Sequence, residues 1–216
     1  MEDLQIQERG TIDRELWAQH RVCAGVDEVG RGCLAGPVVA AAVVLHGKKV
    51  EQISALTRAK LRDSKTLSLK QREEMAELIE TELALAHAVS FATAREVEQY
   101  GIVGATQRAM QTALLQLDIP VDLTLVDGNQ TIQGWAAPQK TLVKGDNLSW
   151  SIAAASILAK VCRDRWMVQA DSHYPGYGFA KHVGYGTAAH RQALQELGPC
   201  VLHRRNFAPI RQMLHP

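Results

Sequence analysis

The sequence predicts an α/β protein in which a mixed β-sheet carries helices on its faces. Short Val-rich apolar runs, typical of buried strands, alternate with longer segments whose apolar residues recur at helical spacing. The chain has 216 residues, 46% of them hydrophobic and 22% charged, which is enough to bury one sizeable core. No repeat and no Pro/Gly/Ser-rich linker divides the sequence, so we expect a single domain.

Five segments have the composition of strands. The first two are rich in valine and are separated by the glycine-rich stretch 30–36, which indicates neighbouring strands joined by a turn. The fourth stops at Asp127-Gly128, a typical turn sequence. The expected strands are 22–29, 37–45, 87–92, 121–126 and 141–144.

Four segments have helical periodicity. The first begins at Ser68, whose side chain can cap the helix while Gln71 reaches back to the cap. The second is expected to stop before Pro120. The third is rich in Ala and Ser in its first half, and these small residues allow a helix to approach a sheet closely. The expected helices are 68–85, 102–117, 148–169 and 187–197, and the chain beyond them is expected to be basic and irregular.

Several classes of protein are excluded. The longest nearly apolar stretch, 34–45, contains Gly36 and Pro37 and is shorter than the roughly 20 residues that a membrane-spanning helix needs. The N-terminus has no basic cluster and no apolar segment, unlike a secretory signal, so we expect a cytoplasmic protein without membrane contact. The cysteines are too scattered for a disulfide scaffold or a zinc motif, and we expect them to be reduced and mostly buried. They are Cys23, Cys33, Cys162 and Cys200.

Charge is unevenly distributed, although the net charge is only +1. Residues 140–211 contain ten basic and four acidic side chains, whereas the rest of the chain is acidic. A basic region of this kind suggests a surface for a polyanion. On charge alone, an ordinary solvated face is an equally good interpretation.

Acidic residues stand at the ends of predicted strands, where α/β proteins place their sites. Asp27 and Glu28 follow apolar residues of the first strand, Asp127 ends the fourth, and Asp146 precedes the long helix. Each has a simpler interpretation by itself, as a loop entry, a turn or a helix N-cap. Together, carboxylates without a cysteine cluster are the oxygen ligands that suit Mg²⁺ or Mn²⁺. Two such ions can activate a water and stabilise the leaving oxygen of a phosphodiester.

Six motifs occur in a particular order along the chain. The first, AGVDEVGRG at 24–32, is far more specific than a lone short pattern. The others are DSK at 63–65, LVDGN at 125–129, KGD at 144–146, SIAAASILAKVCRD at 151–164 and GYGT at 184–187. In this order the motifs closely resemble ribonuclease HII, the bacterial type 2 ribonuclease H family. The resemblance runs from about residue 21 to residue 210.

The resemblance implies a ribonuclease H-like fold: a mixed, roughly five-stranded sheet flanked by helices, with a small C-terminal helical part that helps to hold the substrate. It implies that Asp27, Glu28, Asp127 and Asp146 are the catalytic carboxylates and bind two Mg²⁺ or Mn²⁺ ions. The implied reaction is hydrolysis of the RNA strand of an RNA/DNA hybrid on the 5′ side of a ribonucleotide, leaving 3′-hydroxyl and 5′-phosphate ends. Family members also cut at a single ribonucleotide in duplex DNA, which starts ribonucleotide excision repair.

The resemblance also implies contacts with the substrate. The Gly-Arg-Gly tripeptide would bring backbone close to the 2′-hydroxyl, the group that distinguishes RNA from DNA. The tyrosine of the GYGT motif would stack on the next sugar, and the Ser-Lys pair matches a loop that contacts phosphate. The substrate-binding residues implied in this way are Gly30, Arg31, Gly32, Ser64, Lys65 and Tyr185.

Other polar residues receive weaker interpretations. Asp164 is expected to form a local ion pair, and His190 is expected to be structural rather than catalytic. Cys33 stands where the family usually has proline and Val183 where lysine is common, and these departures bear on affinity rather than on activity. The candidate duplex contacts are Lys144, Lys160, Arg163, Arg165, Arg204 and Arg205.

The expected organisation is an N-terminal extension at 1–20, partly mobile, followed by a catalytic domain at 21–211. We expect a monomer, and residues 211–216 lack the paired aromatics of a sliding-clamp peptide. Two alternatives remain at this point. One is another two-metal nuclease on the same fold, such as an exonuclease. The other is a hybrid-binding module without catalysis, although such a module gains nothing from acids clustered against a phosphate.

Overall fold

A five-stranded mixed sheet forms the centre of the molecule in the computed structural model, which describes residues 8–214. The strand order is β3-β2-β1-β4-β5. The pairs β1–β2 and β2–β3 are antiparallel, whereas β1–β4 and β4–β5 are parallel. The strands are β1 (Cys23–Val29), β2 (Val38–Leu45), β3 (Ala84–Ala92), β4 (Leu123–Asp127) and β5 (Gln139–Leu142). The predicted mixed sheet is confirmed.

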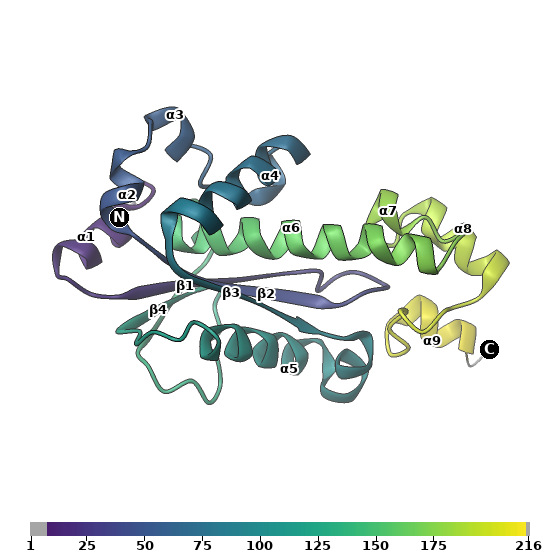
Figure 1. Cartoon of the computed structure of the whole chain (residues 1–216). Helices are drawn as coiled ribbons and strands as arrows, with labels where there is room; N and C mark the ends of the chain where they lie inside the picture. The colour runs from purple at the N-terminus through teal and green to yellow at the C-terminus, as the bar shows by residue number, and fades with distance from the viewer. Residues whose placement is uncertain (1–7, 215–216) are drawn as a thin grey trace, which may run out of the picture.

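Helices cover both faces of the sheet (Figure 1). The long helix α6 (Trp150–His173) and α4 (Leu69–Leu78) lie on one face, and α5 (Ala94–Leu115) lies on the other. Every residue of β2 is buried, because this strand is covered on both sides. The remaining helices are α1 (Thr11–Ala18), α2 (Gly47–Gln52), α3 (Ala55–Arg58), α7 (Phe179–His182), α8 (Ala188–Leu197) and α9 (Ala208–Leu214). None of the helices described is long and apolar enough to cross a membrane.

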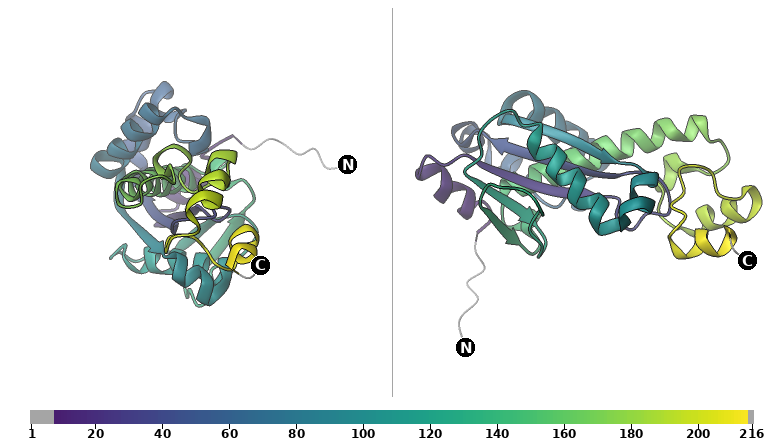
Figure 2. Two further views of the ribbon diagram at one scale, coloured as in Figure 1. Left: turned by 90° about the vertical axis from the view of Figure 1, so that its right-hand side faces the viewer. Right: turned by 90° about the horizontal axis from the view of Figure 1, so that it is seen from below.

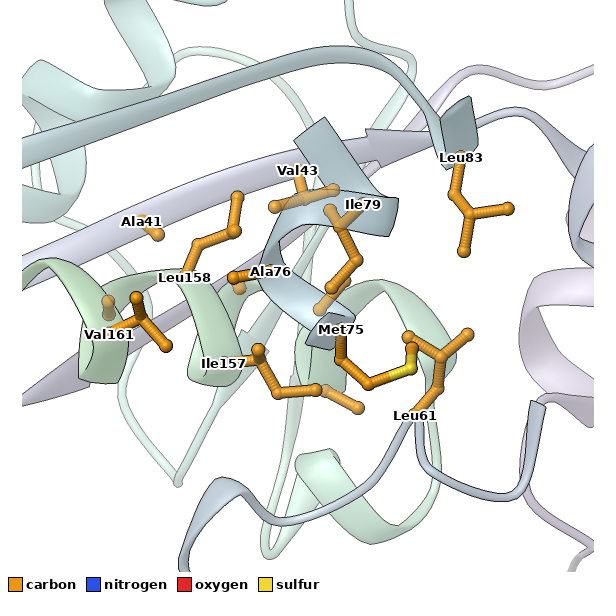
Figure 3. Close-up of a cluster of buried hydrophobic side chains, with 14 of the residues drawn as sticks. Ala41, Val43, Leu61, Met75, Ala76, Ile79, Leu83, Ile157, Leu158 and Val161 are labelled. Atoms are coloured by element: carbon orange, nitrogen blue, oxygen red, sulfur yellow. The ribbon is translucent and has the colours of Figure 1, made fainter. Parts of the chain in front are cut away.

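The core between the sheet and α6 is built from aliphatic side chains (Figure 3). Ala41 and Val43 of β2 face Leu158 of α6, and Met75 and Ile79 close the cluster from the side of α4. A second core lies on the other face of the sheet, under α5. These two layers fix the edge of the sheet at which the acidic residues lie.

The C-terminal part forms a smaller unit at one end of α6, and α1 lies at the opposite end of the molecule (Figure 2). The C-terminal part has its own apolar cluster, which includes Phe179, Leu194 and Ile210. Leu34 and Ala35, from the turn between β1 and β2, belong to the same cluster. The C-terminal part is therefore attached to the loop that carries the Gly-Arg-Gly tripeptide.

Several predicted boundaries are wrong. The helix predicted at 68–85 ends at Leu78, one turn of π-helix continues to Leu83, and β3 begins at Ala84 because this residue pairs with β2. The last strand lies at Gln139–Leu142 instead of 141–144, and α6 continues to His173 instead of residue 169. The second helix begins earlier, at Ala94 after a capping box, and the predicted irregular end contains α9. Tertiary pairing and caps decide these boundaries.

Residues 11–18 of the predicted extension form α1 and pack on the rest of the domain. Ile12 and Leu16 share an apolar cluster with Cys23, Leu125 and Ile152. Helix α1 is therefore attached to the rest of the domain by a common core. The prediction for residues 1–7 lies outside the described residues.

Helix α6 passes very close to β1 at Gly25. A Cβ atom on Gly25 would lie 2.1 Å from the backbone carbon of Ser151. We expect Gly25→Ala to lower the free energy of unfolding by about 1–3 kcal/mol, because α6 and β1 would have to separate. Gly32→Ala is the control, because its Cβ would have no neighbour within 4 Å. Chemical denaturation measures both, and an unchanged stability of Gly25→Ala would contradict the close packing.

Candidate active site

Strand pairing brings the acidic residues together at one edge of the sheet. Val26 of β1 pairs with Val126 of the parallel strand β4, so Asp27 and Asp127 follow side by side. Asp146 lies in a short 3₁₀ turn, Gly145–Asn147, between β5 and α6. The backbone N–H of Gly145 donates to Asp127 Oδ1 at 2.7 Å. This bond holds the turn that carries Asp146 against the end of β4.

Asp27 and Glu28 point to opposite faces of β1, as neighbours in a strand must. Asp27 is 7% exposed and lies beside Ser156 on α6, whose hydroxyl opposes the rise in the pKa of Asp27. Glu28 lies on the face of α5, accepts a bond from Arg31 at 3.1 Å, and lines a cavity of about 100 Å³ together with Asp127. Asp127 therefore lies close to both Asp27 and Glu28, although these two side chains point to opposite faces of the sheet.

The carboxylates raise one another's pKa values. Burial, and then the charges of Glu28 and Asp127, raise the pKa of Asp27 well above its ordinary value. Burial raises the pKa of Glu28, and Arg31 opposes this rise. Burial and the nearby carboxylates of Asp63 and Asp127 raise the pKa of Asp146. The cluster therefore carries an excess of negative charge that a bound cation would neutralise.

The donor set fits a hard divalent cation, because all four residues offer carboxylate oxygens. Each carboxylate also accepts a bond from a local donor: Asp27 from the N–H of Glu28, and Asp146 from Asn147. In the described part of the chain, no three acidic, histidine or cysteine side chains converge into a ready ligand cage. A cation would therefore have to draw these side chains closer together.

The predicted N-cap role of Asp146 is not observed. Ser149 caps α6, and its hydroxyl accepts the N–H of Ile152 at 3.3 Å. Asp127-Gly128 does form a turn, with Gly128 at a φ of 95°. The turn interpretation of Asp127 and its place in the acidic cluster are both correct.

The Gly-Arg-Gly tripeptide begins two residues after Glu28, directly after the last residue of β1, Val29, and starts the turn between β1 and β2. Gly30 has a φ of 88°, and a Cβ atom there would lie 2.2 Å from Nε of Arg163. Arg31 and Gly32 are exposed. Gly30 is buried, so the tripeptide is open to solvent at Arg31 and Gly32.

The sequence predicted Arg163 and Arg204 as duplex contacts, and this prediction is wrong. Both side chains are fully buried. Arg204 donates to the carbonyl groups of Gly30, Arg31 and Gly36 at 2.7–3.1 Å. Arg163 donates to carbonyl groups of the same turn and to that of Val183 at 2.8 Å. The two guanidinium groups thus hold the Gly-Arg-Gly turn and join it to the segment before Tyr185.

The other predicted duplex contacts differ from one another. Lys160 is paired with Asp164 at 2.8 Å, which confirms the predicted local ion pair of Asp164. Arg165 is paired with Glu73. Lys144 and Arg205 are exposed.

Ser64, Lys65 and Tyr185 lie on three separate segments. Ser64 is buried, and its hydroxyl bonds to that of Ser156 at 3.1 Å. Ser156 in turn lies beside Asp27. Lys65 is exposed in the same 3₁₀ turn, Ser64–Thr66. Tyr185 is 38% exposed in the loop after α7. Ser64 therefore supports the acidic cluster from within, and only Lys65 of that pair is open to a phosphate.

Two residues that depart from the family pattern have structural roles. Cys33 is completely buried in the turn after the tripeptide. Val183 has a left-handed backbone, with a φ of 43°. All four cysteines are free, as predicted, although Cys162 and Cys200 are only half-buried.

Three histidines form a connected buried cluster behind Tyr185. His190 Nδ1 lies 2.9 Å from the carbonyl oxygen of Tyr185, and its Nε2 lies 3.0 Å from Nε2 of His203. The ring of His182 stacks on that of His190, with centroids 4.3 Å apart. The N–H of Cys200 donates to Nδ1 of His203. This network confirms the structural role predicted for His190.

Acid is expected to destabilise this cluster. Burial and the neighbouring His190 lower the pKa of His203 to about 4, whereas an unfolded histidine titrates near about 6.5. The unfolded chain therefore binds more protons between these values, and stability falls as pH falls through this window. We expect the melting temperature of His203→Asn to depend less on pH between 6.5 and 4 than that of the wild type. His20→Gln, at an exposed position, should behave as wild type, and equal pH dependence in all three proteins would contradict the assignment.

The comparisons with known proteins agree with this geometry. Residues 24–210 match the family model described as Ribonuclease HII. The chain belongs to the ribonuclease HII family. It is therefore a ribonuclease H, an endoribonuclease that hydrolyses phosphodiester bonds and acts on RNA/DNA hybrids. The family match covers all four acidic residues, the Gly-Arg-Gly turn and the loop that carries Tyr185.

Individual members of the ribonuclease HII family are similar over most of their length. A ribonuclease HII of Synechococcus elongatus is 49% identical over 193 residues, which cover 89% of this chain and 87% of that protein. A ribonuclease HII of Chloroflexus aggregans is 48% identical over 205 residues, which cover 94% and 95%. The crystal structure of ribonuclease H2 from Pyrococcus horikoshii superposes with a TM-score of 0.71 at 26% identity and covers 88% of this chain and 96% of that one. The ribonuclease H-like fold is thus confirmed.

Asp13, Arg204 and His203 were not predicted as parts of the site's support. Asp13 and Arg204 each bond to a segment more than 130 residues away in the chain. His203 acts through His190. Isolated residues on helices and loops carry no local pattern that indicates such partners. Only the burial of a titratable side chain distinguishes them, and burial is visible in the structure alone.

Proposed function

We propose that this ribonuclease HII family member cuts on the 5′ side of a ribonucleotide, both in RNA/DNA hybrids and at a single ribonucleotide in duplex DNA. The ends would be a 3′-hydroxyl and a 5′-phosphate, and the role would be the excision of ribonucleotides from DNA. The observation that carries the proposal is the hydrogen bond of Gly145 to Asp127, which fastens the turn that carries Asp146 to the end of β4, beside Asp27 of the paired strand β1.

Asp27, Glu28, Asp127 and Asp146 are proposed to hold two divalent cations, Mg²⁺ or Mn²⁺. When bound, these cations supply activation of a water and neutralisation of the phosphate charge. The protein's own contribution is to hold the four carboxylates at one edge of the sheet. Arg31 orients Glu28 through their ion pair, and Ser156 lies beside Asp27.

Recognition of the ribonucleotide is proposed to use the two loops that Arg163 connects. The backbone of Gly30, Arg31 and Gly32 would bond to the 2′-hydroxyl, because glycine allows close approach. The half-exposed ring of Tyr185 would stack on the following sugar and disfavour a second 2′-hydroxyl. Lys65 would contact a phosphate of the backbone.

The test uses an end-blocked DNA duplex with one internal ribonucleotide, incubated with the protein and Mg²⁺ or Mn²⁺. A single cut 5′ to the ribonucleotide is expected, with none in an all-DNA duplex and none with the Asp127→Asn protein. Cleavage of a long RNA/DNA hybrid without a cut at the single ribonucleotide would refute the proposed recognition of that ribonucleotide by the Gly-Arg-Gly turn and Tyr185. Blocked ends exclude an exonuclease as the source of the cut. Sedimentation of the same preparation tests the expected monomer.

A further inference from the structure

Asp13 is a buried carboxylate that the proposed mechanism does not use. It lies on α1 and is completely inaccessible to solvent. Its two oxygens accept four hydrogen bonds, all from the first residues of α6 and its cap. The donors are Ser149 Oγ at 3.1 Å, Trp150 N at 2.9 Å, Ser151 N at 3.1 Å and Ser151 Oγ at 2.6 Å.

These bonds place a negative charge at the N-terminus of the longest helix, where the free N–H groups and the helix dipole favour it. Burial raises the pKa of Asp13, and the bonds from Ser149, Trp150 and Ser151 oppose that rise. Within residues 8–214, Asp13 has no ion pair with a basic side chain. The α6 N-terminus is therefore the partner that compensates its charge.

Two neighbours of Asp13 hold the residues between Asp146 and α6. The N–H of Gly10 donates to the carbonyl of Leu148 at 2.8 Å, and Arg9 Nε donates to the carbonyl of Asn147 at 3.2 Å. Asn147 in turn donates from its side chain to Asp146 Oδ1 at 3.1 Å. Residues 9–13 thus contact the whole segment 147–151.

Gly10 shows how closely the two segments fit. Its φ is 80°, and a Cβ atom there would lie 2.3 Å from the ring of Trp150. On the other side of the turn, the bond from Gly145 to Asp127 provides the attachment to the sheet. The turn that carries Asp146 is therefore held from both sides, by β4 and by the segment before β1.

We propose that Asp13 is a positioning residue that holds the Asp146 turn in place and thereby sets the affinity of the site for divalent cations. This rests on the proposed role of Asp146 as a cation ligand. The segment that does this lies before residue 24, where the match to the ribonuclease HII family model begins. Asp13 acts through the backbone of 149–151 and does not touch the reacting atoms.

The test measures Mn²⁺ binding by titration calorimetry on the full chain in the absence of nucleic acid. Asp13→Asn is expected to weaken Mn²⁺ binding by about tenfold or more, as loss of a residue that orients a ligand does. Asp122→Asn is the matched control, because Asp122 also accepts a backbone N–H, that of Val22, at 2.8 Å. Its Mn²⁺ affinity should stay that of the wild type. In activity assays, the Mg²⁺ concentration for half-maximal rate should rise in Asp13→Asn, and excess Mg²⁺ should restore kcat.

A lower melting temperature of Asp13→Asn with unchanged Mn²⁺ affinity would overturn the proposal, because Asp13 would then only stabilise the fold. Arg9→Ala tests the same idea if Asp13→Asn does not fold. It removes only the contacts to Asn147 and should weaken Mn²⁺ binding by a smaller factor, so unchanged binding in Arg9→Ala would then overturn the proposal.

Asp146→Asn separates the ligand role of Asp146 from the positioning role of Asp13. If Asp146→Asn binds Mn²⁺ as the wild type does, the ligand assignment fails. If only Asp146→Asn loses affinity, the assignment stands and the positioning role of Asp13 fails.

Discussion

Asp127→Asn is expected to reduce cleavage with Mg²⁺ to less than a tenth of the wild-type rate. The asparagine oxygen can still accept the N–H of Gly145, so the turn that carries Asp146 keeps its attachment to β4. What the variant loses is one negative charge between Asp27, Glu28 and Asp146, and with it a ligand of the proposed cations. A tenfold loss corresponds to ~1.4 kcal/mol of transition-state stabilisation.

The same variant should fold normally or become more stable, because the carboxylates of the cluster repel one another. The pKa of Asp27 should fall, since the charge of Asp127 is one cause of its elevation. Single-turnover kinetics measures the cleavage rate of Asp127→Asn, and thermal denaturation measures its stability. Asp122→Asn, at the opposite end of β1, is the control and should retain full activity. A rate above a tenth of wild type in Asp127→Asn would contradict the ligand assignment.

Arg204→Ala is expected to lower the free energy of unfolding by about 3 kcal/mol or more. It removes a buried side chain that donates four hydrogen bonds, and it leaves carbonyl groups of Gly30, Arg31 and Gly36 without these donors. Buried groups that lose their partner cost about 1–3 kcal/mol each. Burial lowers the pKa of Arg204 to about 10, so the side chain remains charged at neutral pH.

Equilibrium denaturation in guanidinium chloride measures the loss in Arg204→Ala. Arg205→Ala is the matched control, since Arg205 is the next residue and is exposed, and its change should stay within about 0.5 kcal/mol. Arg204→Lys should be nearly as damaging as Arg204→Ala, because an ammonium group cannot reproduce the planar fork of donors. Equal stabilities of Arg204→Ala and Arg205→Ala would show that the turn needs no such support.

Local pattern in the sequence was sufficient for the strands and for the acidic cluster. Apolar runs that stop at Asp27-Glu28 and at Asp127 predict two strands whose ends carry carboxylates. The structure pairs these strands in parallel, so the acids meet. The period of the apolar residues predicts the elements because each must bury one face or two, and this requirement is local.

Boundaries were less well determined by pattern. Residues 79–83 have apolar residues at helical spacing, yet they form a π-turn and the strand begins at Ala84. Pairing with β2 supplies hydrogen bonds to this segment that its own periodicity does not reveal. The helical pattern is correct as far as Leu78, where no strand competes for the backbone.

The sequence by itself determined the α/β class and the family, and it predicted the four carboxylates proposed to carry the chemistry. Tertiary structure alone decided which charged residues are buried supports and which face solvent. Arg163, Arg204 and Asp13 look like surface residues in the sequence, and the structure shows each of them compensated by distant backbone groups. The reason is physical: the cost of burying a charge depends on partners far away in the chain, and no local pattern contains them.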